Sequence, residues 1–294
     1  MSIINSKKVL REIHTTENVA ILREFHETHP DIHWTSLKYE KTGDTILHVA
    51  SSCTIRSIEA VKLLLEHGAD VNALKKADWT PLMLACTKID EVEIDENNYK
   101  TVEVLLRNGA AINYGNKDGW TALHLIAREG DVRILELLLE HGLNVDRITK
   151  NGRTALHVSA LHSQLDMTKK LIEIGLDVNK KDSCGNTPLH ESILSENLKI
   201  VNVLLENKAD LNCRNKSDFS ILHLASCQGN INVIEYIIDV LKVDINVCTT
   251  SGLTPLHCAA RNKQLKAYEH LLSKGANLNV RDKFERLPSD YLCI

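Results

Sequence analysis

Aromatic residues make up only 4% of this chain, whereas hydrophobic residues as a whole make up 43%. A core of this composition is packed mainly by leucine, isoleucine, valine and alanine, as in stacks of short helices. No apolar run approaches the length of about 18 residues that a membrane-spanning helix needs, so we expect no membrane span. The N-terminal stretch also lacks a long apolar segment, and we expect no secretory signal peptide.

The chain lacks an excess of positive charge and any paired-cysteine motif. Its formal net charge is −4 at pH 7, which argues against non-specific binding of nucleic acid. None of the eight cysteines forms a C-x-x-C pair, and Cys86, Cys227 and Cys258 occupy core-like positions of predicted helices. We therefore expect small, buried, reduced thiols and a cytoplasmic or nuclear location.

Motifs that mark common enzyme classes are missing as well. The sequence contains no phosphate-binding P-loop, no G-x-S-x-G nucleophile elbow and no H-E-x-x-H zinc motif. We expect a monomeric protein that is not an enzyme and needs no cofactor or metal.

The chain does contain one tetrapeptide pattern, repeated seven times. The pattern is Thr-x-Leu-His, with Ser220 in place of the threonine once and Met83 in place of the histidine once. The motifs begin at residues 45, 80, 121, 154, 187, 220 and 254, so they are 35, 41, 33, 33, 33 and 34 residues apart. A period near 33 residues with this tetrapeptide is typical of ankyrin repeats, and the chain resembles that family.

This resemblance implies an all-α ankyrin-repeat solenoid of helix-turn-helix repeats with short β-hairpin-like fingers. We expect residues 1–42 to form a degenerate N-terminal capping repeat, residues 43–285 to form seven repeats, and residues 286–294 to form a truncated C-terminal cap. The interval of 41 residues predicts an acidic insert within residues 87–100. A solvated loop is the favoured interpretation of this insert, and a binding element is the alternative.

Each predicted repeat has the local signals of two helices. The motif threonine is a good helix N-cap, and a proline in the next place, as in Pro81, costs no hydrogen bond. Glycines such as Gly68 and Gly142 follow the second helix, where a left-handed residue is wanted. Six motif histidines lie one repeat apart, and we expect them to bond locally rather than to bind metal: His48, His124, His157, His190, His223 and His257.

Two groups of residues near the fingers are candidates for binding a partner protein. Trp79, Trp120 and Phe219 stand directly before the N-cap, where the resemblance places them on the binding groove. They are either binding anchors or packing residues of the fingers. Basic residues recur at the predicted fingertips, which suggests an acidic partner surface unless it reflects only the polarity of turns: Lys75, Lys76, Lys117, Arg147, Lys150, Lys180, Lys181, Arg214, Lys216, Arg281 and Lys283.

The residues around the second and third motifs go beyond the general ankyrin pattern. The strings 74–83, 116–120 and 127–131 resemble the family of ankyrin repeat domain-containing protein 16. That resemblance implies binding to the catalytic domain of alanyl-tRNA synthetase, with capture of wrongly activated serine on lysine side chains. The matching lysines are Lys76 and Lys117, with Lys150 as a third candidate. Lys75 would then be a partner contact.

A second interpretation remains open beside this one. The chain could be an ankyrin adaptor for some other protein, in which the lysines serve only as basic contacts and undergo no chemistry.

Overall fold

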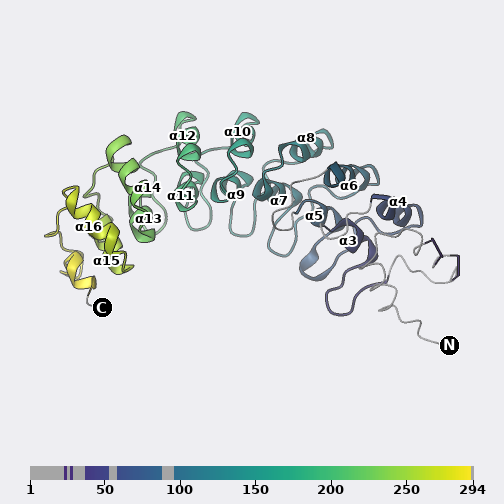
Figure 1. Cartoon of the computed structure of the whole chain (residues 1–294), viewed down its shortest axis with the longest axis horizontal. Coiled ribbons are helices and arrows are strands. Elements are labelled where there is room, and N and C mark those ends of the chain that lie inside the picture. Colours follow the sequence, from purple (N-terminus) through teal and green to yellow (C-terminus); the bar gives the residue numbers. More distant parts are fainter. Residues whose placement is uncertain (1–22, 25–26, 29–36, 53–57, 88–95, 293–294) are drawn as a thin grey trace. The chain divides into compact units, whose positions relative to one another are not determined.

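Consecutive pairs of short helices make up the described part of this computed structural model, which comprises residues 23–24, 27–28, 37–52, 58–87 and 96–292 (Figure 1). The chain divides into two units, Met1–Lys150 and Asn151–Ile294. Within the described ranges, no helix is both long and apolar enough to cross a membrane.

Three helix pairs make up the described part of the first unit. The first helices of the pairs are α3 (Ile46–Ser51), α5 (Pro81–Ala85) and α7 (Ala122–Glu129). The second helices are α4 (Ile58–Glu66), α6 (Glu96–Arg107) and α8 (Val132–Glu140). First helices pack on first helices and second helices on second helices, which gives two layers.

The second unit contains four pairs built in the same way. Its first helices are α9 (Ala155–Leu161), α11 (Pro188–Leu194), α13 (Ile221–Gln228) and α15 (Pro255–Arg261). Its second helices are α10 (Leu165–Glu173), α12 (Leu198–Glu206), α14 (Ile231–Glu235) and α16 (Leu265–Ser273). A π-helical turn, η3 (Tyr236–Val240), continues α14, and a short 3₁₀ helix, η4 (Pro288–Leu292), packs on α15 at the C-terminal end.

Aliphatic side chains fill the space between the two layers, as the composition predicts. The leucine of every motif is at most 1% exposed, because it lies on the face that each first helix turns toward its neighbours. The prediction of an all-α repeat fold is therefore confirmed for the described residues.

The motif threonine begins each first helix for a reason visible in its hydrogen bonds. In α9 the Thr154 hydroxyl accepts the backbone N–H of His157, while the His157 ring accepts the N–H of Thr154 at Nδ1. This reciprocal arrangement satisfies helix N–H groups that would otherwise have no partner.

Glycine ends most second helices because the next residue must be left-handed. Gly68, Gly109 and Gly142 have φ of 81°, 83° and 86°, a conformation that costs glycine little. Lys208 takes the same place after α12 with φ of 68°.

Asparagine side chains join the loops that follow the second helices. Asn72 Nδ2 donates to the Gly109 carbonyl at 3.1 Å, and its Oδ1 accepts the Ala111 N–H at 2.7 Å. Asn113 and Asn179 make the same pair of bonds to the next loop in their own units.

The fingers are the tight turns that lead into each first helix, and they are turns rather than hairpins. The described residues contain no strand, and their one isolated bridge joins Lys38 to Thr45. Two backbone bonds close a finger: the Asn116 N–H donates to the Trp120 carbonyl at 2.9 Å, and the Gly119 N–H donates to the Asn116 carbonyl at 2.8 Å. A finger of five residues is too short for further ladder bonds. The chain therefore reverses direction as in a hairpin, but no pair of strands flanks the turn.

Several boundary predictions fall partly outside the described residues. Most of the predicted capping repeat over residues 1–42 and the centre of the acidic insert, residues 88–95, lie there. The last part of the predicted insert, from Glu96 to Lys100, belongs to α6. At the other end, the predicted C-terminal cap contains η4, whose Tyr291 is buried with its ring 6.0 Å from that of His257.

Candidate protein-binding surface

Most fingers carry a short polar side chain at their first residue, and four of them are built around it. The Asn116 Oδ1 accepts the backbone N–H groups of Asp118 and Trp120, both at 2.9 Å. Asp182, Asn215 and Asp282 hold their fingers with the same two bonds. Side chains of this kind fix a turn because they replace backbone acceptors.

Backbone hydrogen bonds also join successive fingers. In the first unit, Lys76 donates its N–H to the Thr42 carbonyl at 2.9 Å, and Lys117 donates to Ala77 at 3.1 Å. Lys150 donates to the Asp118 carbonyl at 2.9 Å. The three lysines therefore occupy one structural position in consecutive fingers.

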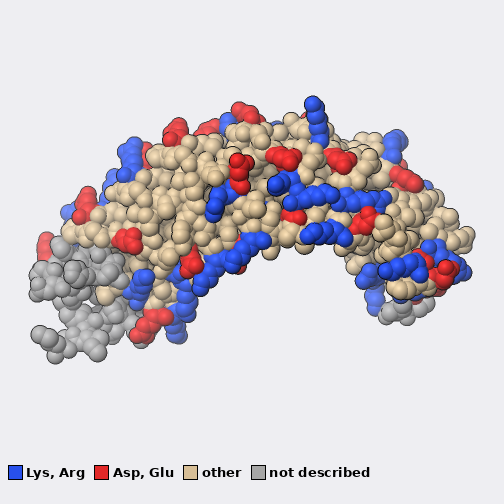
Figure 2. All heavy atoms as spheres, turned by 180° about the vertical axis from the view of Figure 1, so that it is seen from behind, with Lys and Arg blue, Asp and Glu red and all other residues tan. Residues whose placement is uncertain are grey.

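We call Lys76, Lys117 and Lys150 the lysine column. Their side chains are exposed, and the backbone bonds place Lys150 in the register of Lys117, in agreement with its position four residues before the motif threonine. Figure 2, seen from behind, shows Lys and Arg side chains along the finger edge of the first unit. In the second unit, Lys216 and Lys283 stand at the same finger position and are also exposed.

Lys75 differs from the lysine column in its surroundings. Its ammonium lies 2.7 Å from the Asp44 carboxylate, with 23% of its side chain exposed. Lys75 stands at the first position of its finger, where other fingers carry Asn, Asp or Thr. Lys75 is thus used within the fingers themselves, which leaves it less available to a partner than Lys76.

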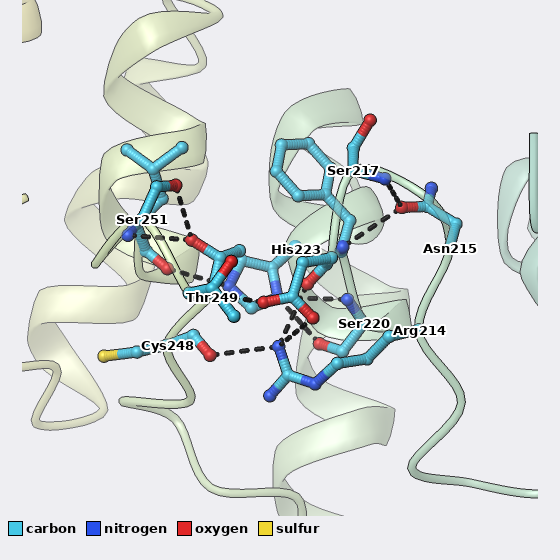
Figure 3. Close-up of polar contacts among 12 residues, drawn as sticks. Arg214, Asn215, Ser217, Ser220, His223, Cys248, Thr249 and Ser251 are labelled. Atoms are coloured by element: carbon cyan, nitrogen blue, oxygen red, sulfur yellow. Dashed lines mark hydrogen bonds and ion pairs between the residues drawn. The ribbon is translucent and has the colours of Figure 1, made fainter. Parts of the chain in front are cut away.

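One junction of the second unit replaces the backbone acceptor by a side chain (Figure 3). The Asp218 carboxylate accepts the Thr250 N–H at 2.5 Å, and the Arg214 guanidinium donates to the carbonyls of Asp218 and Cys248, both at 2.9 Å. The pKa of Asp218 is lowered, first by the bond from the Thr250 backbone and also by Arg214. Arg214 therefore spans two fingers and is partly occupied by the fold.

The motif histidines have the structural role that the sequence predicts. His190 contacts its own Thr187 hydroxyl with Nδ1 at 2.9 Å, and its Nε2 donates to the Phe219 carbonyl of the next finger at 3.3 Å. His48, His157, His223 and His257 make the same two contacts. Burial lowers the pKa of His190 and His223 to about 4, so both rings are neutral at neutral pH.

The three aromatic residues before the N-caps are half-buried. The Trp120 ring meets the His124 ring edge-on at 5.9 Å, and the Phe219 ring stacks on His223 at 5.5 Å. These rings therefore pack on the motif histidines with one side and leave the other partly accessible. Their role as partner anchors stays a prediction.

A buried ion pair was not evident from the motifs. Arg153, at the position of the aromatics in another repeat, lies 3.1 Å from Glu191, whose side chain is completely buried in α11. Burial raises the pKa of Glu191, and the Arg153 guanidinium opposes this rise. A charged residue directly after the motif histidine was the signal, because that place is apolar in the other motif repeats.

The cysteine prediction is right for two residues and wrong for the third. Cys86 and Cys258 are each 2% exposed, whereas Cys227 is only half-buried. Cys227 lies in the last turn of α13, where the helix leaves the core.

Comparison with known proteins agrees with the repeat geometry. A family model for ankyrin repeats in three copies matches residues 14–95, 89–182 and 189–282, and a second model for many copies of ankyrin repeats matches residues 165–205. A segment of 48 residues is 38% identical to the probable 26S proteasome regulatory subunit p28 of Saccharomyces cerevisiae. That segment covers 16% of this chain and 21% of the yeast protein. The paired helices, the bonded fingers and the family match together show that this chain belongs to the ankyrin-repeat family.

Proposed function

We propose that the chain binds a partner protein through its fingers and that the lysine column contacts an acidic surface of that partner. The observation that carries this proposal is the register of Lys76, Lys117 and Lys150 in three bonded fingers. Because the fingers are fixed by backbone bonds, the three ammonium groups can be presented with little loss of backbone entropy on binding.

The charge distribution supports an acidic partner. The chain carries a net charge of −4, yet these fingertip positions are basic. Complementary charge of this kind accelerates association and makes it sensitive to salt.

Alanyl-tRNA synthetase is the partner we propose, on the basis of the sequence strings around the first two lysines of the column. In this proposal a neutral lysine amine attacks the carbonyl carbon of seryl adenylate, an amide forms and AMP leaves. The partner would hold the adenylate beside the fingers, and this proximity replaces elaborate activation of the amine. The lysines act as a stoichiometric sink that limits mistranslation, and the chain is not an enzyme.

Binding is tested by charge reversal with a matched control. A triple variant with Lys76, Lys117 and Lys150 changed to Glu is compared by calorimetry with a variant in which Lys62, Lys199 and Lys266 are changed to Glu. The control lysines are exposed on second helices, so the net charge changes equally. We expect the column variant to lose at least about tenfold in affinity for the synthetase, and the control to lose much less. Equal losses would argue against a specific role of the column.

Acylation is tested separately, by peptide mapping after incubation with the synthetase, ATP and serine. A seryl mass is expected on one or more lysines of the column. Arginine at these positions keeps the charge but removes the nucleophile, so binding should persist while acylation disappears. A stable complex without any seryl-lysine would leave the chain as an adaptor without chemistry, and no complex at all would exclude the synthetase.

A further inference from the structure

One repeat of the second unit carries a buried charge where the other repeats are apolar. Glu191 follows the motif histidine His190 in α11, and its side chain is completely buried. The other motif repeats hold a valine, a leucine or a cysteine at this place: Val49, Leu84, Leu125, Val158, Leu224 and Cys258. Such side chains fill the place without bringing a charge into the interior, so the packing of the repeats does not require a carboxylate.

The Glu191 carboxylate holds two side chains that stand directly before helix N-caps. Its Oε1 lies 3.1 Å from the Arg153 guanidinium and 3.5 Å from the side-chain nitrogen of Asn186. The Arg153 Nε lies 3.7 Å from a carboxylate oxygen of Asp182 as well. Arg153, Asn186 and Phe219 take the same place in three consecutive repeats, and we call them the pre-cap row.

We expect the buried carboxylate to lower the stability of the fold. Two charges lose hydration when they are buried, and their mutual attraction often fails to offset this loss, so apolar residues of similar volume are as stable or more stable. In the part of the chain that the structure describes, the second oxygen of Glu191, Oε2, is buried and accepts no hydrogen bond, which adds to the loss. Residues that lower stability while they fix surface neighbours are typical of binding sites.

The pre-cap row is accessible although Glu191 is not. The Arg153 side chain is 31% exposed, and Asn186 and Phe219 are half-buried. The carboxylates of Glu191 and Asp182 already compensate the Arg153 charge, so a third carboxylate from a partner would be repelled by them. A neutral acceptor suits this guanidinium better, and main-chain carbonyls are the neutral acceptors that every protein offers. An extended segment presents them, because a helix uses its carbonyls internally.

We propose that the pre-cap row binds an uncharged, extended peptide segment of the partner, with Arg153 donating to a main-chain carbonyl and Phe219 packing on an apolar side chain. Glu191 is a positioning residue, because it is too deeply buried to touch the segment and acts by holding Arg153 and Asn186. This inference rests on the proposed function, and it adds a contact that salt does not screen to the salt-sensitive contacts of the lysine column.

Calorimetry with alanyl-tRNA synthetase tests the inference with a variant whose net charge is unchanged. Arg153→Leu combined with Glu191→Val removes one charge of each sign and copies Leu253 and Val158, which other repeats carry at these places. We expect the affinity to fall at least about tenfold. Thermal unfolding of this double variant should show a midpoint equal to or above that of the wild type, because the buried charges are gone.

A matched control removes an ion pair from the surface of the same unit. Asp166 and Lys169 are exposed on α10 and lie 3.9 Å apart, so changing both to alanine also leaves the net charge unchanged. This control should bind like the wild type. An equal loss of affinity in the control and in the double variant would overturn the assignment of the pre-cap row.

The salt dependence of binding identifies the group that Arg153 receives. For a neutral acceptor, the double variant should lose the same factor in affinity at about 0.05 M and at about 0.3 M salt. A loss that shrinks at the higher salt concentration would indicate a partner carboxylate and would overturn the assignment of a main-chain carbonyl.

Single variants separate contact from positioning. Glu191→Gln keeps an acceptor for the Arg153 N–H, so the affinity should stay within about threefold of the wild type. Glu191→Val leaves Arg153 present but no longer held by Glu191, and it should lose most of the affinity that the double variant loses. Full affinity in Glu191→Val, together with a loss in Arg153→Leu, would contradict the positioning role of Glu191.

Failure of this inference and failure of the proposed function give different results. If the folded double variant binds the synthetase like the wild type, the pre-cap row has no role in binding, while the lysine column can still bind the partner. If the wild-type chain forms no complex with the synthetase, both proposals are overturned.

Discussion

His223 donates its Nε2–H to the carbonyl oxygen of Leu253, 30 residues further along the chain, at 3.0 Å. Its Nδ1 lies 2.8 Å from the Ser220 hydroxyl and also accepts the Ser220 N–H. Both nitrogens are therefore occupied in the neutral ring, and a second proton would enter at Nδ1, where it meets a backbone donor. Protonation would therefore break the bond that Nδ1 accepts from the Ser220 N–H, whereas the bond from Nε2–H to the next repeat would remain.

Acid should destabilise the chain in a defined pH range. His190 and His223 have pKa values of about 4 in the folded chain, against about 6.5 when unfolded. Because the folded pKa is lower, their contribution is present above pH 6.5 and is lost as the pH falls toward 4. We expect urea unfolding to show a loss of about 4 kcal/mol between pH 7 and pH 5 for the two together. His223→Gln should reduce this dependence, and replacement of the exposed His141 by Gln should not.

A side chain at Gly119 should lower the free energy of unfolding, because the finger of Gly119 touches the next finger. A Cβ there would lie 2.7 Å from the Lys150 backbone nitrogen, and φ is 76°. Gly142 has φ of 86° but nothing within 4 Å, so it serves as the matched control. Gly142→Ala should cost about 1 kcal/mol of unfolding free energy from backbone strain alone, and Gly119→Ala about 2 kcal/mol or more. Similar losses in the two variants, measured by chemical denaturation, would show that the finger contact can relax.

Lys208→Gly should stabilise the second unit. Lys208 has φ of 68°, its side chain is exposed, and five other repeats carry glycine at this position. Removal of the left-handed strain should raise the free energy of unfolding by up to about 1 kcal/mol, less the entropy that glycine gains in the unfolded chain. Lys169→Gly, in the interior of α10, should instead lower it by a similar amount. A loss of stability in Lys208→Gly would refute the strain argument.

Trp120→Ala should weaken partner binding by roughly 2 kcal/mol if the tryptophan is an anchor. The ring packs on His124 with one edge, so circular dichroism and thermal unfolding must first show an intact fold. The same change at Trp79 should have a similar effect. Tyr268→Ala removes a half-buried aromatic side chain from α16 and should leave affinity unchanged. Unchanged affinity in both tryptophan variants would assign these residues to packing.

Features that depend on residues close together along the chain could be predicted from the sequence. Thr154 and His157 are three residues apart, so their bonds follow from the helix start, and Gly142 follows from the helix end. The partner of the second histidine nitrogen was not predictable, because the Asn186 carbonyl lies 29 residues away and its position depends on how the repeats stack.

The same limit applies to the candidate sites. Lys117 and Lys150 each stand four residues before a motif threonine, so their equivalence follows from the repeat, whereas the backbone bond from each lysine to the preceding finger does not. Cys227 and Cys258 lie on α13 and α15, two first helices that pack against each other although the two residues are 31 positions apart in the sequence. Residue type and helical periodicity favour burial for both, whereas exposure of Cys227 depends on where α13 ends.

The bond from Lys117 to Ala77 spans the longest interval between motifs, 41 residues, yet it matches the bonds across shorter intervals in kind and length. The Asn72 bridge to Gly109 and Ala111 is likewise preserved across this repeat. The spacing of the binding elements is therefore decoupled from the number of residues in each repeat. We therefore expect that a reporter peptide or a second recognition loop can be inserted between α5 and α6 without a change in the spacing of the lysine column.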